Sequence, residues 1–146
     1  MEKRMRLYGC INYLLTVAQH EVFQVFSEGL STFNITPGQY GVLRCLWEGS
    51  ACTPKEIAQT LRLENSTISG VLDRMEKKGL IQRELDPNDR RSIQVVLTPE
   101  GASMRDGVLQ VIDDLNQKVL DGFSPEQRAM FIDSLRHVGN VEQETD

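Results

Sequence analysis

The chain has 146 residues, of which 40% are hydrophobic and 25% charged, and its formal net charge is −5. This composition is typical of a globular domain, and it excludes disordered, collagen-like and disulfide-rich classes. No apolar run reaches the roughly 18 residues that a membrane span needs, and no apolar leader follows the opening Met-Glu-Lys-Arg. Three unpatterned cysteines fit a reducing compartment, so we expect a cytoplasmic protein with no membrane contact.

The negative charge is concentrated in the last third of the chain. Residues 99–146 carry four basic and ten acidic side chains, whereas residues 53–98 carry eight basic and seven acidic ones. Residues 1–52 carry four of each sign. A polyanion would therefore bind the middle third, although charge balance alone does not identify a DNA-binding protein.

The N-terminal segment is predicted to be a helix. Its apolar residues recur at steps of three and four, on one helical face: Leu7, Ile11, Leu14, Ala18, Val22 and Val25. A second stripe through Tyr8, Leu15, Phe23 and Phe26 widens this surface. So broad an apolar circumference needs cover on more than one side, and a partner subunit is a natural cover.

Four later helix starts share a capping hydroxyl followed by proline: Thr36-Pro37, Thr53-Pro54, Thr98-Pro99 and Ser124-Pro125. Two of them have the residues of a full capping box, Thr53 with Glu56 and Ser124 with Gln127. The helices predicted from these starts span residues 37–48, 54–61, 99–121 and 125–138. A further helix is predicted over residues 65–78.

One stretch departs from the helical pattern. Leu80–Leu85 and Ile93–Leu97 are short runs of strand-forming residues, joined by a segment rich in Pro, Asn and Asp. These turn residues predict a hairpin whose tip carries Arg90 and Arg91.

Helices 54–61 and 65–78, with a three-residue turn between them, have the lengths of a helix-turn-helix. A step of about 100° per residue places the apolar side chains of helix 65–78 opposite its polar ones. The apolar set is Ile68, Val71, Leu72 and Met75, and the polar set is Ser66, Thr67, Ser69, Gly70, Asp73, Arg74 and Lys77. Small side chains and hydroxyls near a helix N-terminus suit entry into a major groove. An ordinary solvated helix face is the alternative, and Asp73 is expected to orient Arg74, or another basic side chain that contacts the DNA backbone, rather than meet DNA.

A hairpin that directly follows a helix-turn-helix makes a winged helix. Residues two apart in an extended segment share a side, so Asp89 is expected to hold the Arg91 guanidinium. A guanidinium fixed on a narrow hairpin has the shape and charge to enter a minor groove. Taken alone, the hairpin tip would more often be a solvated charged turn.

The run from Ser66 to Arg83 (Ser-Thr-Ile-Ser-Gly-Val-Leu-Asp-Arg-Met-Glu-Lys-Lys-Gly-Leu-Ile-Gln-Arg) resembles the MarR (multiple antibiotic resistance regulator) family. Asp86–Arg91 and Val96–Gly101 continue the match. The resemblance implies a mainly α (α+β) fold, with a winged helix-turn-helix in residues 36–98 and dimerisation helices in residues 1–35 and 99–146. It implies a homodimeric transcription regulator, usually a repressor, that binds a pseudo-palindromic operator in double-stranded DNA. Such proteins are often released by a small phenolic or other aromatic effector.

The same resemblance implies roles for individual residues. Helix 65–78 would lie in the major groove with Ser66, Thr67, Ser69 and Arg74 toward the bases, and Gly70 and Lys77 share that face. The wing, residues 84–93, would place Arg91 in the minor groove, braced by Asp89, with Arg90 near the DNA backbone.

The terminal helices of the family form its dimer interface, and the periodicity here agrees. Val108, Ile112, Leu115, Val119 and Phe123 recur at steps of three and four, and Phe131, Leu135 and Val138 continue in the last helix. The predicted interface residues are Leu7, Ile11, Leu14, Ile112, Leu115, Val119, Phe131 and Leu135. A monomeric helical core is the alternative.

Two further functions within the same fold stay open, a thiol-based redox sensor and a winged-helix protein–protein adaptor. In peroxide-sensing relatives the reactive cysteine corresponds to Asn12 here, two residues from Cys10. Cys45 lies in an apolar stretch and is expected to be buried, whereas Cys52 precedes a helix cap.

No enzymatic or metal chemistry is indicated. The sequence shows no Gly-rich phosphate loop and no nucleophile–base arrangement, and His20 and His137 have no Cys or His at metal-ligand spacing. We therefore predict no enzyme activity, no cofactor and no metal. Tyr13, His20 and Trp47 are weak candidates for an effector pocket, since each is more often a plain core or surface residue.

Overall fold

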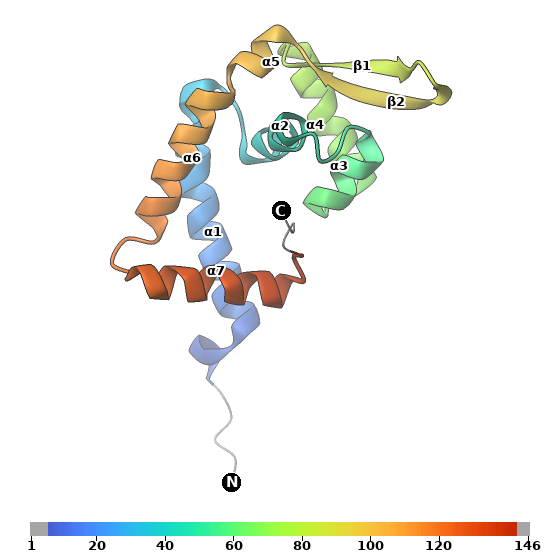
Figure 1. The fold of residues 1–146 in the computed structure, drawn as a ribbon. Coiled ribbons are helices and arrows are strands. Elements are labelled where there is room, and N and C mark those ends of the chain that lie inside the picture. The colour runs from blue at the N-terminus through green and yellow to red at the C-terminus, as the bar shows by residue number, and fades with distance from the viewer. Residues whose placement is uncertain (1–5, 143–146) are drawn as a thin grey trace.

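The computed structural model describes residues 6–142, which form a mainly helical fold with one two-stranded sheet (Figure 1). The long helices are α1 (Ile11–Leu30), α2 (Pro37–Glu48), α3 (Pro54–Leu61), α4 (Asn65–Lys77), α6 (Arg105–Val119) and α7 (Pro125–Gly139). Shorter helical segments are η1 (Leu7–Gly9), η2 (Ser31–Phe33) and α5 (Pro99–Ser103). The hairpin strands β1 (Ile81–Asp86) and β2 (Asp89–Leu97) lie between α4 and α5. The predicted fold class and element order are confirmed.

The hydroxyl residues before each proline cap their helices as the sequence predicts. Of the two capping boxes that the sequence predicts, one is present and the other is not. Thr53 accepts the backbone N–H of Glu56, while the Glu56 carboxylate accepts the N–H of Cys52 (3.3 Å) instead of that of Thr53. The second full box lies at Thr36, whose backbone N–H donates to the Gln39 side chain (3.2 Å). The box predicted at Ser124 is present.

The helix predicted over residues 99–121 is two helices. The chain turns at Met104, so that α5 packs on β2 while α6 runs along α1 (Figure 1). One straight helix would not follow both surfaces. The first helix also differs from the prediction, because its regular part begins at Ile11 and the segment Leu7–Gly9 is a 3-10 turn.

The core fills the space between α2, the helix-turn-helix and the hairpin. Ile57 of α3, Leu72 and Met75 of α4, and Ile81 and Val95 of the strands are almost completely buried. The backbone N–H of Val95 also donates to the carbonyl of Cys52 (2.7 Å), which fixes β2 against the segment that leads into α3.

The same core continues between α1 and α6. A Cβ added at Gly29 would lie 2.7 Å from Leu115 Cδ1, so glycine allows these two helices to approach closely. Ile112 and Leu115 are 5% and 8% exposed in the single chain. These two residues, which the sequence predicts for the dimer interface, are thus already part of the single-chain core where α6 packs on α1.

Polar contacts also join the elements around this core. Lys78, at the end of α4, donates to the carbonyl of Asn34 (2.7 Å) and to the side chain of the buried Gln39 (3.0 Å). The Trp47 indole N–H donates to the carbonyl of Gly101 (3.0 Å). The position of α4 is thus fixed from the end of α1 and from α2.

Within residues 6–142, every helix is too short or too polar to cross a bilayer.

Gly101→Ala is expected to destabilise the protein by about 2–3 kcal/mol, because a new side chain in a filled site forces the backbone to shift. The added Cβ would lie 2.2 Å from the Leu80 carbonyl oxygen, a backbone atom that α4 and β1 hold in place. Gly38→Ala is the matched control, since its Cβ would meet its nearest atoms only at 3.9 and 4.0 Å. Urea denaturation followed by circular dichroism measures both variants, and equal midpoints would contradict the prediction.

Candidate nucleic-acid interface

Helix α4 presents the polar face that the sequence predicts. Ile68, Val71, Leu72 and Met75 are buried, and Ser66, Thr67 and Ser69 on the other side are exposed. Within residues 6–142 the hydroxyls of these three residues make no hydrogen bond with other side chains or with the backbone. They are available to donate to, or accept from, a base edge.

Two basic side chains extend this face. Arg74 and Lys77 are exposed, and a Cβ placed on Gly70 would lie 3.4 Å from Arg74 Nη1. The absence of a side chain at Gly70 therefore leaves room for the guanidinium to lie along the helix surface. Gly70 lies on the polar face of α4, as the sequence predicts.

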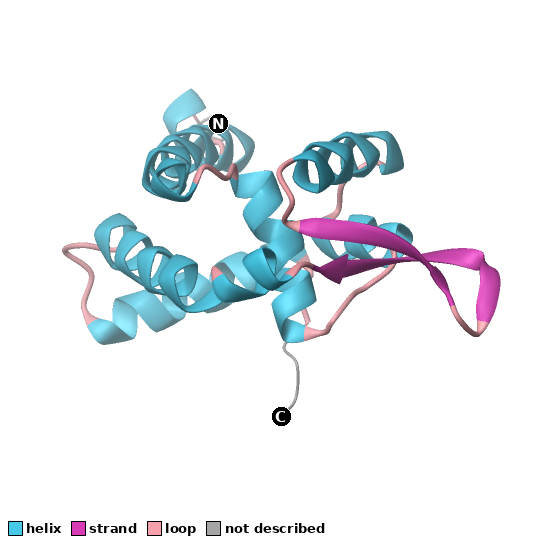
Figure 2. Ribbon diagram, turned by 90° about the horizontal axis from the view of Figure 1, so that it is seen from above, coloured by secondary structure: helices cyan, strands magenta, loops and turns pink. Residues whose placement is uncertain are grey.

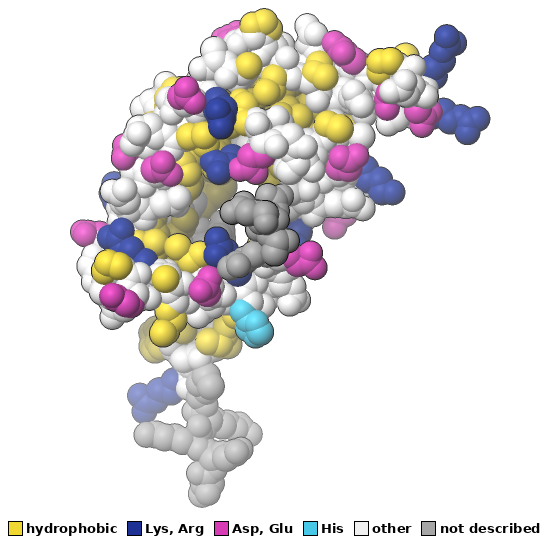
Figure 3. Space-filling model, in the orientation of Figure 1, with side chains coloured by type: hydrophobic (Ala, Val, Ile, Leu, Met, Phe, Trp, Pro, Cys, Tyr) yellow, Lys and Arg dark blue, Asp and Glu magenta, His cyan; other side chains and the backbone are white. Residues whose placement is uncertain are grey.

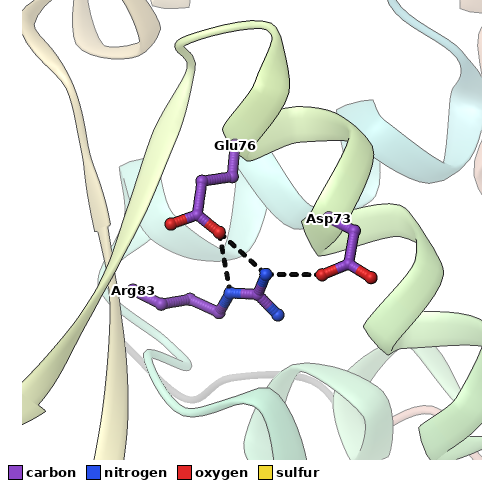
Figure 4. A network of polar contacts seen from close by, with 3 residues as sticks. All are labelled: Asp73, Glu76 and Arg83. Atoms are coloured by element: carbon purple, nitrogen blue, oxygen red, sulfur yellow. Dashed lines mark hydrogen bonds and ion pairs between the residues drawn. The ribbon is translucent and has the colours of Figure 1, made fainter.

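Asp73 and Glu76 of α4 hold the guanidinium of Arg83 from β1 (Figure 4). Arg83 Nη2 lies 2.5 Å from Asp73 Oδ1 and 2.7 Å from Glu76 Oε2, and Arg83 Nε donates to the same Glu76 oxygen at 3.0 Å. These hydrogen bonds, to Asp73 first and then to Glu76, raise the pKa of Arg83 above its ordinary value. The partner of Asp73 is thus Arg83 and not Arg74 as the sequence predicts, and the contact links α4 to β1 of the hairpin.

Arg83 has two consequences for a DNA-facing surface. It offsets two carboxylates that would otherwise repel phosphate. It also attaches β1 to α4, so that the hairpin and the exposed hydroxyls keep a fixed relative position.

The hairpin is longer and its turn tighter than the sequence predicts. Asp86 pairs with Asp89 across a turn of Pro87 and Asn88, and the Asp86 side chain accepts the N–H of Asn88 (2.9 Å). The local hydrogen bonds of the Asp86 side chain stabilise such a turn.

Asp89 acts on the backbone rather than on a guanidinium. Its carboxylate accepts the backbone N–H of Arg91 (3.0 Å), and the Arg91 guanidinium has no ion pair among residues 6–142. The prediction that Asp89 holds the Arg91 guanidinium is therefore wrong, and the Asp89 carboxylate stabilises the turn instead. Arg90 and Arg91 are both exposed. Figure 3 shows basic side chains at the hairpin tip, extending away from the body of the protein.

The half of β2 nearer the hairpin turn adjoins the N-terminus of α3. Arg91, Ser92 and Ile93 line a shallow surface depression together with Thr53, Lys55, Glu56 and Gln59. Seen from above, the hairpin projects from one side of the helical body (Figure 2). The wing and the start of the helix-turn-helix therefore form one continuous surface.

The terminal helices carry exposed apolar side chains. Of the predicted interface residues, Leu7, Ile11 and Leu14 in the N-terminal segment and Phe131 and Leu135 in α7 are exposed, and Val119 is half-buried. No residue of α7 is buried in the single chain. Phe123 and Phe131 pack edge to face with ring centroids 5.6 Å apart. Figure 3 shows hydrophobic side chains grouped on the part of the molecule that α1 and α7 form.

The three cysteines have different surroundings. Cys10 and Cys52 are exposed, and Cys45 is buried as predicted. Burial raises the pKa of the Cys45 thiol, which keeps it protonated and unreactive at neutral pH. Within the described part of the chain, no three Cys, His, Asp or Glu side chains gather as metal ligands.

The weak effector candidates have separate neighbours. The Trp47 indole donates to Gly101, Tyr13 packs edge to face on Tyr8 at 6.0 Å, and the His20 Nε2 lies 3.2 Å from the Gln24 amide. These contacts give each residue a structural role of its own.

Comparisons with known proteins agree on one family. The family model of the MarR family matches residues 35–93. The organic hydroperoxide resistance transcriptional regulator of Bacillus subtilis (strain 168) is 33% identical over 107 residues, which cover 73% of each chain.

Two solved structures share the fold. A mutant MarR from E. coli in complex with operator DNA is 29% identical, covers 88% of this chain and 92% of its own, and superposes with a TM-score of 0.79. Bordetella bronchiseptica BpsR, from a study of how 6-hydroxynicotinic acid regulates its DNA binding, is 20% identical. It covers 96% of this chain and 100% of its own, with a TM-score of 0.85.

The sequence motif, the winged helix and these relatives lead to the same conclusion. Members of this family are transcriptional regulators and not enzymes. The chain belongs to the MarR family of winged helix-turn-helix transcriptional regulators.

Proposed function

We propose that this regulator is a homodimeric, sequence-specific repressor that leaves its operator when a small molecule binds. The observation that carries the proposal is the Arg83 link, which makes the exposed polar face of α4 and the arginine-tipped wing one surface. Helix α4 fits the major groove of a duplex, and the narrow wing attached to it fits the minor groove.

In this proposal α4 lies in the major groove with Ser66, Thr67 and Ser69 against base edges. Arg74 and Lys77 follow along the same exposed face. Arg91 of the wing enters the minor groove, and Arg90 contacts phosphate beside it. Most of the affinity comes from phosphate contacts, so binding weakens steeply as salt rises.

The second copy of the chain covers α1 and α7. The exposed leucine, isoleucine and phenylalanine side chains there are the kind of surface that a monomer rarely leaves open. We assign residues 1–35 and 99–146 to dimerisation and residues 36–98 to DNA binding. Two symmetric heads would then contact half-sites about one helical turn apart, roughly 34–36 Å.

Release by a ligand requires that the ligand bind one arrangement of the two heads better than the other. The regulation of BpsR by 6-hydroxynicotinic acid supports a small organic effector in a protein of this fold. A repressor that works on chromosomal operators acts in the cytoplasm.

A thiol-based sensor is the second candidate, because the B. subtilis relative is a regulator of organic hydroperoxide resistance. Cys10, at the N-cap of α1, and Cys52 are the thiols that an oxidant can reach. Asn12 stands at the position that resemblance assigns to the sensing cysteine, which favours the ligand-responsive proposal.

Arg91→Ala is expected to weaken binding to a duplex selected by the wild-type protein by about 1–3 kcal/mol, because the groove contact is lost. Binding to random duplex should change less. Arg90→Ala, one residue away on the same turn, should weaken both duplexes alike and reduce the salt slope by about 1. Fluorescence anisotropy at several salt concentrations measures both effects.

Lys118→Ala provides the charge control for these variants. It removes one positive charge at the far end of α6, away from the wing (Figure 1). If Arg91→Ala and Lys118→Ala bind the selected duplex equally well, the wing does not contact DNA. If the wild-type protein selects nothing from a random pool, the DNA-binding proposal itself is refuted.

Arg83→Ala is expected to reduce affinity for the selected duplex about tenfold, or 1.4 kcal/mol, because it frees two carboxylates and loosens the wing. Folding stability should change by less than about 1 kcal/mol, since the pair is largely exposed. Adding Asp73→Asn and Glu76→Gln to Arg83→Ala should restore part of the affinity. A triple variant as weak as Arg83→Ala would show that repulsion by the carboxylates plays no part.

Leu135→Asp is expected to convert the dimer to a folded monomer, because it places a charge in the apolar surface of α7 without touching the single-chain core. Light scattering after size exclusion gives the mass, and circular dichroism checks the helix content. Gln59→Asp introduces the same charge on α3 and should stay dimeric. A monomeric wild-type protein would contradict the proposed assembly.

A further inference from the structure

The turn of the helix-turn-helix contacts the last helix of the chain through one side chain. Arg62, between α3 and α4, donates from Nη1 to the carbonyl of Gly139 (2.5 Å) and from Nη2 to the carbonyl of Asn140 (2.8 Å). These carbonyls belong to the C-terminal end of α7, 77 and 78 residues further along the chain. Figure 1 shows the end of α7 returning toward α3.

The chemistry of this contact is well matched. Asn140 ends α7 in a left-handed conformation, and the N–H of Val141 donates to Arg136 while that of Asn140 donates to His137. The carbonyls of Gly139 and Asn140 have no helical partner, and they lie at the negative end of the helix dipole. A planar guanidinium spans two neighbouring acceptors, whereas a lysine ammonium offers a single point charge.

The backbone at Arg62 indicates that the side chain is needed there. Arg62 is the C-cap of α3 with a φ of +53°, a left-handed conformation in which glycine or asparagine is favoured. An arginine at this position is therefore explained by what its guanidinium binds rather than by the turn.

The contact also matters because α7 has few other attachments. None of its residues is buried in the single chain. Among residues 6–142, the other side-chain hydrogen bonds of α7 stay within residues 123–137. The Arg62 guanidinium is thus the hydrogen-bonded link from the head to this helix.

We propose that Arg62 is a positioning residue that sets the half-site spacing the dimer accepts. This inference rests on the proposed function, in which α7 is part of the dimer base and α4 reads DNA. Arg62 lies three residues before the first residue of α4 and holds the end of α7, so it fixes the angle between head and base within each subunit. Because the contact is exposed, it is weak enough to yield when an effector favours another angle.

The test compares wild type with Arg62→Gly and Arg62→Lys on duplexes whose two half-sites are moved apart or together by one or two base pairs. Glycine suits the left-handed backbone, so Arg62→Gly removes the guanidinium without straining the turn. Arg128→Ala is the matched control, because Arg128 donates only to the nearby Phe123 carbonyl.

Wild type and Arg128→Ala should prefer one spacing by roughly tenfold or more, since each head contacts its own half-site. Arg62→Gly should lose most of this preference while keeping wild-type affinity for a single half-site. The spacing preference of Arg62→Lys should lie between those of wild type and Arg62→Gly, because lysine keeps the charge but lacks the two-donor guanidinium. In the free protein, amide hydrogen exchange over residues 136–142 should be about tenfold faster in Arg62→Gly, since local opening becomes easier.

Three results would overturn the inference, and they are distinguishable. Wild type and Arg62→Gly with the same spacing preference would refute the role of Arg62 and leave the regulator proposal intact. A wild-type protein that binds every duplex equally would refute the proposed function, and the inference with it. Equal amide exchange over residues 136–142 in both proteins would refute the contact itself.

Discussion

The burial of one face of α4 is the constraint on which the rest of the structure depends. Ile68, Leu72 and Met75 pack into the core beneath α2 and the strands. Because a helix is rigid, this burial decides which side chains point outward. The hydroxyls and the basic residues that follow them are therefore exposed by the same packing that stabilises the fold, and no loop is needed to position them.

Packing alone does not orient this face relative to the wing or to the terminal helices. Three cations of the middle third supply that orientation by binding oxygens of other elements: Arg83 binds carboxylates of α4, Lys78 a carbonyl after α1, and Arg62 carbonyls of α7. Of the eight basic residues in residues 53–98, these three are engaged within the protein. Five others, Lys55, Arg74, Lys77, Arg90 and Arg91, are exposed and lie on α3, α4 or the wing.

Features that depend on neighbouring residues could be predicted from the sequence, and features that depend on distant ones could not. The hydroxyl–proline helix starts and the two faces of helix 65–78 depend on local spacing, and the structure confirms them. The break at Met104 arises because α5 and α6 pack on different elements, which no local pattern records. Likewise, the apolar periodicity predicts that Ile112 is buried, but it does not predict that α1 of the same chain buries it.

The candidate site shows the same division. The exposure of Ser66, Ser69 and Arg91 followed from helix periodicity and from turn residues. Arg83 and Arg62 were missed as site residues because their partners lie on other elements. The sequence does contain a hint of the Arg83 contact. Arg83 is a charged residue inside a strand, and the preceding helix carries two acidic residues, Asp73 and Glu76, one helical turn apart. For Arg62 there is no such hint until its backbone conformation is known.

The distribution of engaged and exposed cations resolves the contradiction between an acidic protein and a DNA-binding surface. Residues 99–146 carry the excess of acid, although α6 and α7, which lie away from the wing (Figure 1), themselves hold five acidic and four basic side chains. The exposed cations on the head orient the molecule in the field of a polyanion before any contact forms. Five cations of each head have no hydrogen bond or ion pair within residues 6–142, and these are free to contact phosphate. The total of 16 basic residues overstates the electrostatic affinity, because part of that charge holds the reading surface together.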